Sequence, residues 1–321
     1  MKNVLFLAVI LLALPNPVEA QRVTGTARVG WLEVCDPGLR SGAFDIFRSR
    51  LAERGYVEGR NLVLDRRFAD CRYERLPALA HELVQLPADV LFVFGTRPAK
   101  IVAGAVKTTP LVVFSCDPFE HVTRLARPGG NVTGVTCMTA ELSPKRLELL
   151  KQAVPTVSRV MFLHDPDHAP TGLKLTQDAA TRLGIGLQVF EVRAADEFAP
   201  ALTAIAKERA DALLVFPDVI LSAAPRPRQL ADFAIKSTLP TMHAFRHFVD
   251  AGGLMSYGAT FSEVFTIAAD QVVKVLEGAR PSELPLREAT RFELVINQKT
   301  AKALGLTIPP SVLQRADHVI E

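Results

Sequence analysis

Polar or glycine residues directly follow four apolar runs of the 321-residue sequence, and these residues could hold a small molecule. The four run ends are Gly95-Thr96, Ser115-Cys116-Asp117, His164-Asp165 and Pro217-Asp218. Ligands of open parallel sheets bind beyond the carboxyl ends of the strands, so each run end is a candidate contact. Two run ends lie in the first half of the chain and two in the second half. The pattern therefore predicts a cleft between two lobes.

The residue types at these run ends indicate which ligand groups they could bind. Thr96 precedes a predicted helix, whose free backbone N–H groups would suit a carboxylate or another anion, although a plain N-cap would use the same residue. Asp117 and Asp218 could each accept a bond from a ligand amine or hydroxyl, and Ser115 shares their position. A cap or turn role would also explain the two acids.

Tyr257 lies in a glycine-rich segment, residues 252–258, that we expect to cross between the lobes. Its ring could stack on a ligand, or the glycines could serve only a tight turn. The candidate ligand contacts that we take from the sequence are Gly95, Thr96, Ser115, Asp117, His164, Asp165, Asp218 and Tyr257.

Metal binding and catalysis have weaker support in the sequence. The segment 164–168 (HDPDH) and the i, i+4 pair His243 and His247 resemble metal ligands, but neither set has third and fourth ligands at a recognisable spacing. No G-x-S-x-G, P-loop, H-E-x-x-H or strand-associated G-x-G-x-x-G pattern occurs. A nucleophile could be assembled from Cys116 and His164, but nothing in the sequence points to it. We therefore expect a binding protein without a catalytic residue, metal or cofactor.

Apolar runs alternate with amphipathic stretches along the chain, and this pattern occurs twice, before and after Thr136. Alternating strands and helices are typical of parallel sheets built from right-handed βαβ units. The uninterrupted apolar strands support this, because both faces of a parallel sheet are covered. The fold class that we predict is α/β, with two doubly wound parallel-sheet lobes.

The N-terminus resembles a secretory signal peptide. Lys2 is followed by an apolar run, residues 4–14, and then by two prolines and a small residue at position 20. The run is shorter than the roughly 20 residues of a membrane-spanning helix, although an uncleaved anchor is the alternative. We expect cleavage after Ala20 and export to the periplasm, and Gln21 in place of Cys does not indicate a lipoprotein. The formal charge of +3 is too weak to predict a nucleic-acid partner.

Four cysteines in an exported chain are compatible with disulfides, and four cysteines allow three pairings. In the strand order 2-1-3-4-5 of a doubly wound lobe, Cys35 and Cys71 follow neighbouring strands, and so do Cys116 and Cys137. We therefore predict the disulfides Cys35–Cys71 and Cys116–Cys137.

Six segments resemble the periplasmic substrate-binding components of ABC transporters, in the poorly characterised branch related to tryptophan/tyrosine-type binding proteins. These segments are residues 55–70, 75–84, 126–136, 143–155, 251–258 and 291–321. The resemblance implies the type I periplasmic-binding fold, with three crossover segments and a ligand clamped between the lobes. We expect residues 22–138 and 258–285 in lobe 1, and residues 139–257 and 286–321 in lobe 2.

The resemblance also bears on the site. Family members carry Gly-Ser/Thr-x-Pro after the third strand, matched here by residues 95–98, and Asp-Pro after the fourth strand, matched by residues 117–118. Members that bind amino acids carry an Asn- and Glu-bearing loop where this chain has residues 164–168. The expected function is delivery of a small ligand, amino-acid-like or another small anion, to a membrane permease. An exported enzyme using the same cleft and a ligand sensor without transport are the alternatives.

Overall fold

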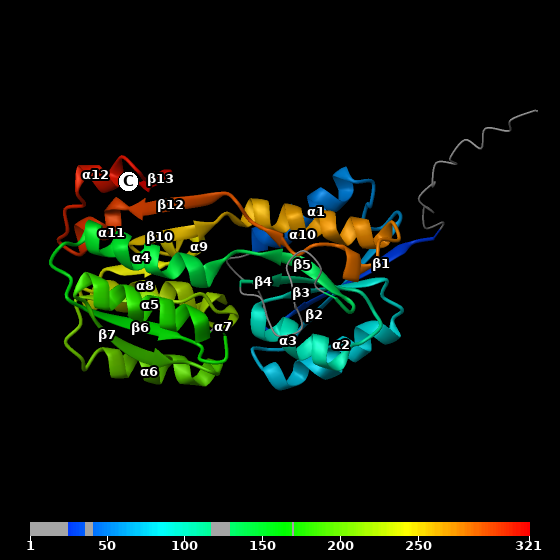
Figure 1. Cartoon of the computed structure of the whole chain (residues 1–321), viewed down its shortest axis with the longest axis horizontal. Coiled ribbons are helices and arrows are strands. Elements are labelled where there is room, and N and C mark those ends of the chain that lie inside the picture. Colours follow the sequence, from blue (N-terminus) through cyan, green and yellow to red (C-terminus); the bar gives the residue numbers. More distant parts are fainter. Residues whose placement is uncertain (1–24, 36–40, 117–128, 169) are drawn as a thin grey trace, which may run out of the picture.

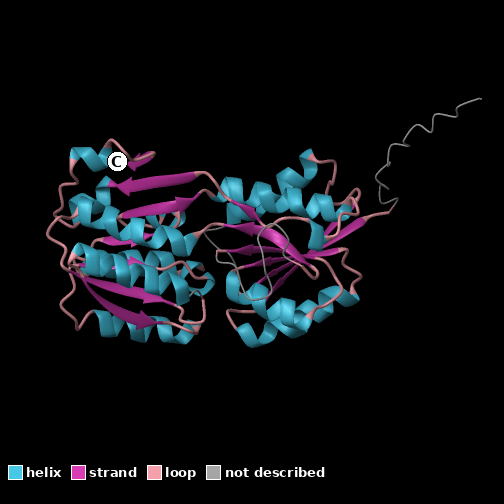
Figure 2. Cartoon of the chain, viewed as in Figure 1, coloured by secondary structure: helices cyan, strands magenta, loops and turns pink. Residues whose placement is uncertain are grey.

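The alternating apolar runs form two α/β lobes that lie end to end (Figure 1). The computed structural model describes residues 25–35, 41–116, 129–168 and 170–321. The predicted signal peptide and Asp117 lie outside these ranges. Each lobe has a sheet with helices packed on both faces (Figure 2), which confirms the predicted fold class.

The first sheet has the order β11-β5-β4-β3-β1-β2, and all of its neighbouring strands are parallel. Its strands are β1 (Ala27–Glu33), β2 (Leu62–Phe68), β3 (Val90–Phe94), β4 (Leu111–Ser115), β5 (Val132–Thr136) and β11 (Arg287–Glu288). The helices of this lobe are α1 (Ser41–Glu53), α2 (Leu76–Gln85), α3 (Thr96–Ala105) and α10 (Phe261–Leu276), with 3-10 turns at Tyr73–Arg75 and Pro281–Glu283. Every residue of β3 and β4 is buried, as expected for central strands covered on both faces.

The second sheet has the order β13-β12-β10-β9-β8-β6-β7. Its strands are β6 (Arg159–His164), β7 (Gly186–Glu191), β8 (Ala212–Val215), β9 (Thr241–His243), β10 (Met255–Ala259), β12 (Phe292–Asn297) and β13 (His318–Ile320). The helices are α4 (Thr139–Ala153), α5 (Pro170–Leu183), α6 (Phe198–Ile205), α7 (Val219–Ser222), α8 (Arg226–Lys236), α9 (Arg246–Asp250), α11 (Gln298–Ala303) and α12 (Pro310–Leu313), with a 3-10 turn at Ala195–Glu197. Only the β10–β12 pair is antiparallel among the described pairings of this sheet.

Three segments cross between the lobes: β5 to α4, β10 to α10, and β11 to β12. The buried side chain of Arg146, on α4, ties two of these crossings together. Its Nε donates to the carbonyl of Tyr257 at 2.7 Å, and its Nη atoms donate to the carbonyl and hydroxyl oxygens of Thr139 at 3.0 Å. The hinge is therefore held by one guanidinium that belongs to the second lobe.

Cys35 and Cys71, the first predicted pair, form a disulfide, with their Cα atoms 4.4 Å apart. After β2 the chain turns back through two residues with positive φ, Asp70 and Cys71, and this turn brings the two cysteines together. The second predicted pair, Cys116 and Cys137, forms no disulfide, and both thiols are buried. The positive-φ turn after β2 includes Cys71 itself, whereas the positive-φ residue after β5 is Met138, one residue beyond Cys137.

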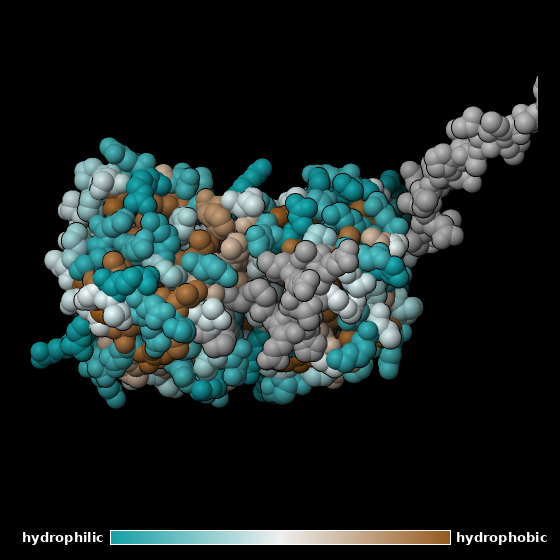
Figure 3. Space-filling view, viewed as in Figure 1, coloured by the Kyte–Doolittle hydropathy of each residue, from teal (hydrophilic) through white to brown (hydrophobic). Residues whose placement is uncertain are grey.

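Within the described part of the chain, no helix has the length and apolar character needed to cross a bilayer. The face of the molecule in Figure 3 is largely hydrophilic, and apolar residues gather near the junction between the lobes.

Candidate ligand-binding site

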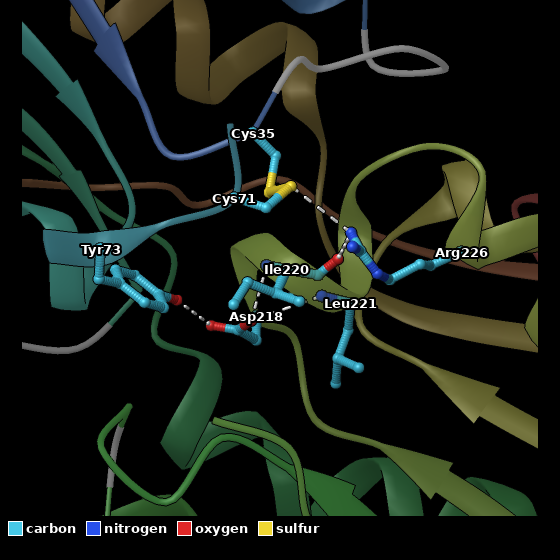
Figure 4. Close-up of a disulfide and its surroundings, with 7 residues drawn as sticks. All are labelled: Cys35, Cys71, Tyr73, Asp218, Ile220, Leu221 and Arg226. Atoms are coloured by element: carbon cyan, nitrogen blue, oxygen red, sulfur yellow. Dashed lines mark hydrogen bonds between the residues drawn. A yellow bond between two sulfur atoms is a disulfide. The ribbon is translucent and has the colours of Figure 1, made fainter. Parts of the chain in front are cut away.

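The carboxyl ends of the two sheets face each other, and side chains from one lobe contact the other directly. The hydroxyl of Tyr73, in lobe 1, donates to Oδ2 of Asp218 in lobe 2 at 3.3 Å (Figure 4). Arg97, at the start of α3, donates from Nη1 to Oδ2 of Asp165 at 3.0 Å and to the carbonyl of Arg193 at 3.1 Å. The structure therefore shows the closed arrangement of the lobes.

Gly95 lies at a place where the two lobes come close together. It precedes α3 with a φ of 107°, and a Cβ atom there would lie 2.5 Å from Cγ1 of Val219 on α7. A side chain at this position would be strained and would also hold the lobes apart. The Gly-Thr-Arg-Pro segment therefore combines a turn that needs glycine with a docking point for the opposite lobe.

The hydroxyl of Thr96 connects the ends of β3 and β4. Its Oγ1 accepts hydrogen bonds from the hydroxyl of Ser115 at 3.2 Å and from the backbone N–H of Cys116 at 3.0 Å. Because Thr96 accepts both bonds, its hydroxyl hydrogen remains able to donate to another group. Thr96 and Ser115 thus stand just behind the cleft surface at the N-terminus of α3.

A small cavity remains between the closed lobes, and its walls are mainly apolar. Its volume is about 20 Å³, which is room for about one water molecule. The residues that line it are Phe94, Gly95, Phe114, Cys116, His168, Pro217, Asp218, Val219, Ser222, Phe245 and Phe261. We call this space the phenylalanine cavity, after its four aromatic walls. A solute larger than water can occupy it only when the lobes part.

Asp218 is the buried carboxylate of this cavity. Its Oδ1 accepts the backbone N–H groups of Ile220 at 2.7 Å and Leu221 at 3.4 Å, so it also caps α7 (Figure 4). Its Oδ2 lies 3.4 Å from Nδ1 of His168. Burial alone would raise the pKa of Asp218, but the bonds from His168 and Ile220 outweigh burial and lower it. The carboxylate is therefore ionised at neutral pH.

The surroundings of Asp165 and Tyr73 raise the pKa of both groups. Burial, followed by the charge of Asp218, raises the pKa of Asp165 to about 6, against the opposing effect of Arg97. Burial also raises the pKa of Tyr73 well above its ordinary value, so its hydroxyl remains a donor. The guanidinium of Arg97 lies 3.9 Å from the centre of the Tyr73 ring, which positions that ring beside the cleft.

The predicted contacts divide into three groups. Gly95 and Asp218 line the phenylalanine cavity, and Thr96, Ser115 and Asp165 lie directly beside it. In the described structure, His164 and Tyr257 do not line it. The ring of His164 lies 5.2 Å from that of Phe162 and has a pKa lowered by burial, and the ring of Tyr257 lies 6.4 Å from that of Phe292. Asp117 lies outside the described residues.

The site also includes residues that the sequence did not single out as ligand contacts. Tyr73 reaches the cleft from the turn after the disulfide, and His168 comes from the end of the HDPDH loop. The four phenylalanines of the cavity could not be recognised from the sequence, because phenylalanine at the end of a strand or the start of a helix is also common in a hydrophobic core. Arg97 also lies at the lobe contact, but it fills the variable position of the Gly-Ser/Thr-x-Pro pattern, so the match carried no signal for it.

Comparison with known proteins gives the family. A family model described as ABC transporter substrate binding protein matches residues 37–320. The chain belongs to this family. A relative in Clostridioides difficile (strain R20291), named tyrosine-binding protein, is 24% identical over 266 residues, which are 81% of this chain and 75% of the relative. These names indicate a binding protein rather than an enzyme.

Solved structures agree with this assignment of the substrate-binding protein. A conserved domain protein from Vibrio cholerae O1 biovar El Tor has a TM-score of 0.85 and 27% identity, covering 92% of this chain and 99% of that one. An ABC domain from Streptococcus pneumonia in complex with L-Trp has a TM-score of 0.82 and 26% identity, covering 92% and 100%. The fold is therefore that of a type I periplasmic-binding protein, and a small-molecule ligand and an ABC permease are its partners.

Proposed function

We propose that this substrate-binding protein captures an amino-acid-like solute with an aromatic body and a protonated amine, and delivers it to its permease by lobe closure. The observation that carries the proposal is an ionised, buried carboxylate, Asp218, in the wall of a cavity with four phenylalanine rings. A buried carboxylate is stabilised by a cation, and the rings suit an aromatic group.

Each part of such a solute would have a partner in the cleft. The ammonium group would bind Asp218, where it would add to the bonds from Tyr73 and His168. The carboxylate would lie at the N-terminus of α3, where the helix dipole and the Thr96 proton favour an anion. The relatives named for tyrosine and solved with L-Trp support this class of ligand, although the HDPDH loop departs from the family pattern.

Lobe closure would follow from the same contacts. A ligand shifts a two-state equilibrium only through its differential affinity for the two states. In the proposed complex, Asp218 from lobe 2 and Thr96 from lobe 1 both contact the solute, so the solute favours lobes closed around it over lobes held apart. The Arg97–Asp165 ion pair would then add ligand-independent stability to the closed form.

Thermal-shift measurements and calorimetric titration test this proposal. We expect L-tryptophan, L-tyrosine or L-phenylalanine to raise Tm without being turned over, because a ligand that binds only the folded state stabilises it by RT ln(1 + [L]/Kd). Indole-3-propionate, which lacks the amine, should bind at least tenfold more weakly than L-tryptophan. Asp218→Asn should abolish this discrimination, since the amide keeps the cap acceptor of α7 but removes the charge.

Asp232→Asn is the matched control, because Asp232 is an exposed carboxylate on α8 that pairs with Arg228 away from the cleft. It should bind as the unmodified protein does. Lack of any stabilisation by the three aromatic amino acids, or an unchanged affinity in Asp218→Asn, would contradict the proposed ligand class.

We further propose that the chain is exported to the periplasm after cleavage behind Ala20. The Cys35–Cys71 disulfide supports this, because disulfides persist in oxidising compartments. N-terminal sequencing of the protein from a periplasmic extract should give Gln21 as the first residue. Recovery of the uncleaved chain from the cytoplasm would contradict this proposal.

A further inference from the structure

A second, larger pocket lies beside the crossing from β10 to α10. Its volume is about 390 Å³, within the range of small-molecule sites. The residues that line it are Phe245, Arg246, His247, Asp250, Ala259, Thr260, Phe261, Ser262, Glu293 and His318. We call it the hinge pocket, because Thr260 and its neighbours form one of the crossings.

Phe245 and Phe261 line both the hinge pocket and the phenylalanine cavity, so this pair of rings separates the two spaces. The ring centroids are 4.7 Å apart. Phe245 precedes α9 in lobe 2, whereas Phe261 is the first residue of α10, which packs on α1 and the sheet of lobe 1. Each lobe thus supplies one of the two rings. Movement of the lobes apart would separate the rings and join the two spaces.

The hinge pocket differs in chemistry from the phenylalanine cavity. One wall of the hinge pocket is aromatic, since the rings of His247 and Phe261 stack with their centroids 5.4 Å apart. Its polar groups are the ion pair of Arg246 and Asp250, at 3.4 Å, and the carboxylate of Glu293, 3.5 Å from Nε2 of His318. Glu293 is the most buried of these carboxylates, with 14% of its side chain exposed. It would accept a hydrogen bond from a hydroxyl or amine that enters the pocket.

We propose that the hinge pocket is a second compartment of the ligand site, and that Phe245 and Phe261 close on either side of an aromatic ring whose far end carries a hydrogen-bond donor for Glu293. The inference rests on the proposed function, since it assigns the far end of the same ligand. The phenylalanine cavity alone is too small for an aromatic amino acid, and the adjoining pocket supplies the missing space. The substrate class is thereby narrowed to aromatic solutes with a polar ring substituent.

Paired ligands that differ only in a ring hydroxyl test this assignment. The full mature chain would be titrated calorimetrically with L-phenylalanine and L-tyrosine, and with L-tryptophan and 5-hydroxy-L-tryptophan. We expect the hydroxylated member of at least one pair to bind about tenfold more tightly, because a hydrogen bond to a largely buried carboxylate is a strong one. In Glu293→Gln this preference should fall to less than threefold, while the parent amino acid keeps its affinity.

Glu288→Gln, an exposed carboxylate on β11, is the matched control and should retain the preference. Phe245→Ala gives a second readout that does not depend on Glu293: loss of one ring of the partition should weaken both members of a pair together. Equal affinities within both pairs for the unmodified protein, or an unchanged preference in Glu293→Gln, would overturn the second compartment alone. Absence of binding by all four amino acids would overturn the proposed ligand class, and the compartment with it.

Discussion

Nη1 of Arg97 lies 3.0 Å from Oδ2 of Asp165, and this ion pair joins the start of α3 in lobe 1 to the end of β6 in lobe 2. The same guanidinium lies 3.3 Å from Asp167 and stacks on the ring of Tyr73. The side chain of Asp165 is fully buried, and that of Arg97 is 21% exposed. Arg97 therefore contributes more to the closed state than an exposed surface pair would.

Replacement of Arg97 should weaken ligand binding by favouring the open lobes. In Arg97→Gln the buried Asp165 loses its cation, and we expect a cost to closure of about 1–3 kcal/mol, equivalent to roughly 5- to 150-fold in Kd. Calorimetric titration with the tightest-binding aromatic amino acid measures this change. Arg75→Gln is the control, because Arg75 pairs with Asp70 within lobe 1, and its Kd should stay within twofold. A similar Kd for both variants would contradict a role of the Arg97–Asp165 ion pair in closure.

The fold could be predicted from the sequence because parallel strands covered on both faces are continuous apolar runs, and 90–94 and 111–115 are such runs. Ligands bind at the carboxyl ends of parallel strands, and this rule pointed to Gly95 and Asp218, which follow the buried strands β3 and β8. Tyr73 and Arg97 could not be found by this rule, because their place in the cleft depends on how the lobes meet. The Cys116–Cys137 prediction was wrong because strand adjacency does not fix the direction in which the two side chains point, and a disulfide needs both side chains directed toward each other.

The raised pKa of Asp165 predicts a pH dependence of stability. Burial, and then the charge of Asp218, move this pKa from 3.8 to about 6. Between these values the folded chain binds more protons than the unfolded chain, so the contribution of this group is full below about pH 4 and is lost as pH rises through 6.

Relative to Asp165→Asn, the unmodified protein should therefore lose about 2–3 kcal/mol of unfolding free energy between pH 4 and pH 7. Urea denaturation of both proteins at each pH unit measures the difference. A difference that stays constant over this range, or that grows in favour of the unmodified protein, would show that folding does not raise the pKa of Asp165.

His243 should make the stability of the fold fall as the pH is lowered, the opposite of the dependence expected from Asp165. Burial lowers the pKa of this imidazole from 6.5 to about 3, and its ring stacks on that of Phe248 at 4.6 Å. The folded chain then binds fewer protons than the unfolded chain between these values, so the contribution is full above about pH 6.5 and is lost as pH falls toward 3.

His243→Leu should accordingly lose less stability on acidification than the unmodified protein, by about 3 kcal/mol between pH 7 and pH 4. Denaturant titrations at the two pH values give this number. His81→Leu, at an exposed position on α2, is the control and should follow the unmodified protein. Identical acid sensitivity of all three proteins would rule out His243 as a buried neutral group.

Arg146 should be needed for the hinge because it bonds the carbonyl of Tyr257 and both oxygens of Thr139. A lysine cannot reproduce the planar fork of the guanidinium, so Arg146→Lys would leave buried acceptors without a donor. We expect a loss of about 2–4 kcal/mol in unfolding free energy, measured by urea denaturation. Arg159→Lys, at an exposed position on β6, should change stability by less than about 0.5 kcal/mol. Equal, small effects of the two substitutions on unfolding free energy would show that Arg146 does not stabilise the hinge.

Small-angle X-ray scattering, with and without a saturating aromatic amino acid, tests most directly whether the lobes close on a solute. The ligand-free protein should scatter as a mixture of open and closed forms, and the complex should have a smaller radius of gyration than this mixture. Gly95→Ala, whose Cβ would meet Val219, should fail to reach this value. An identical radius of gyration with and without a ligand that calorimetry shows to be bound would contradict capture by lobe closure.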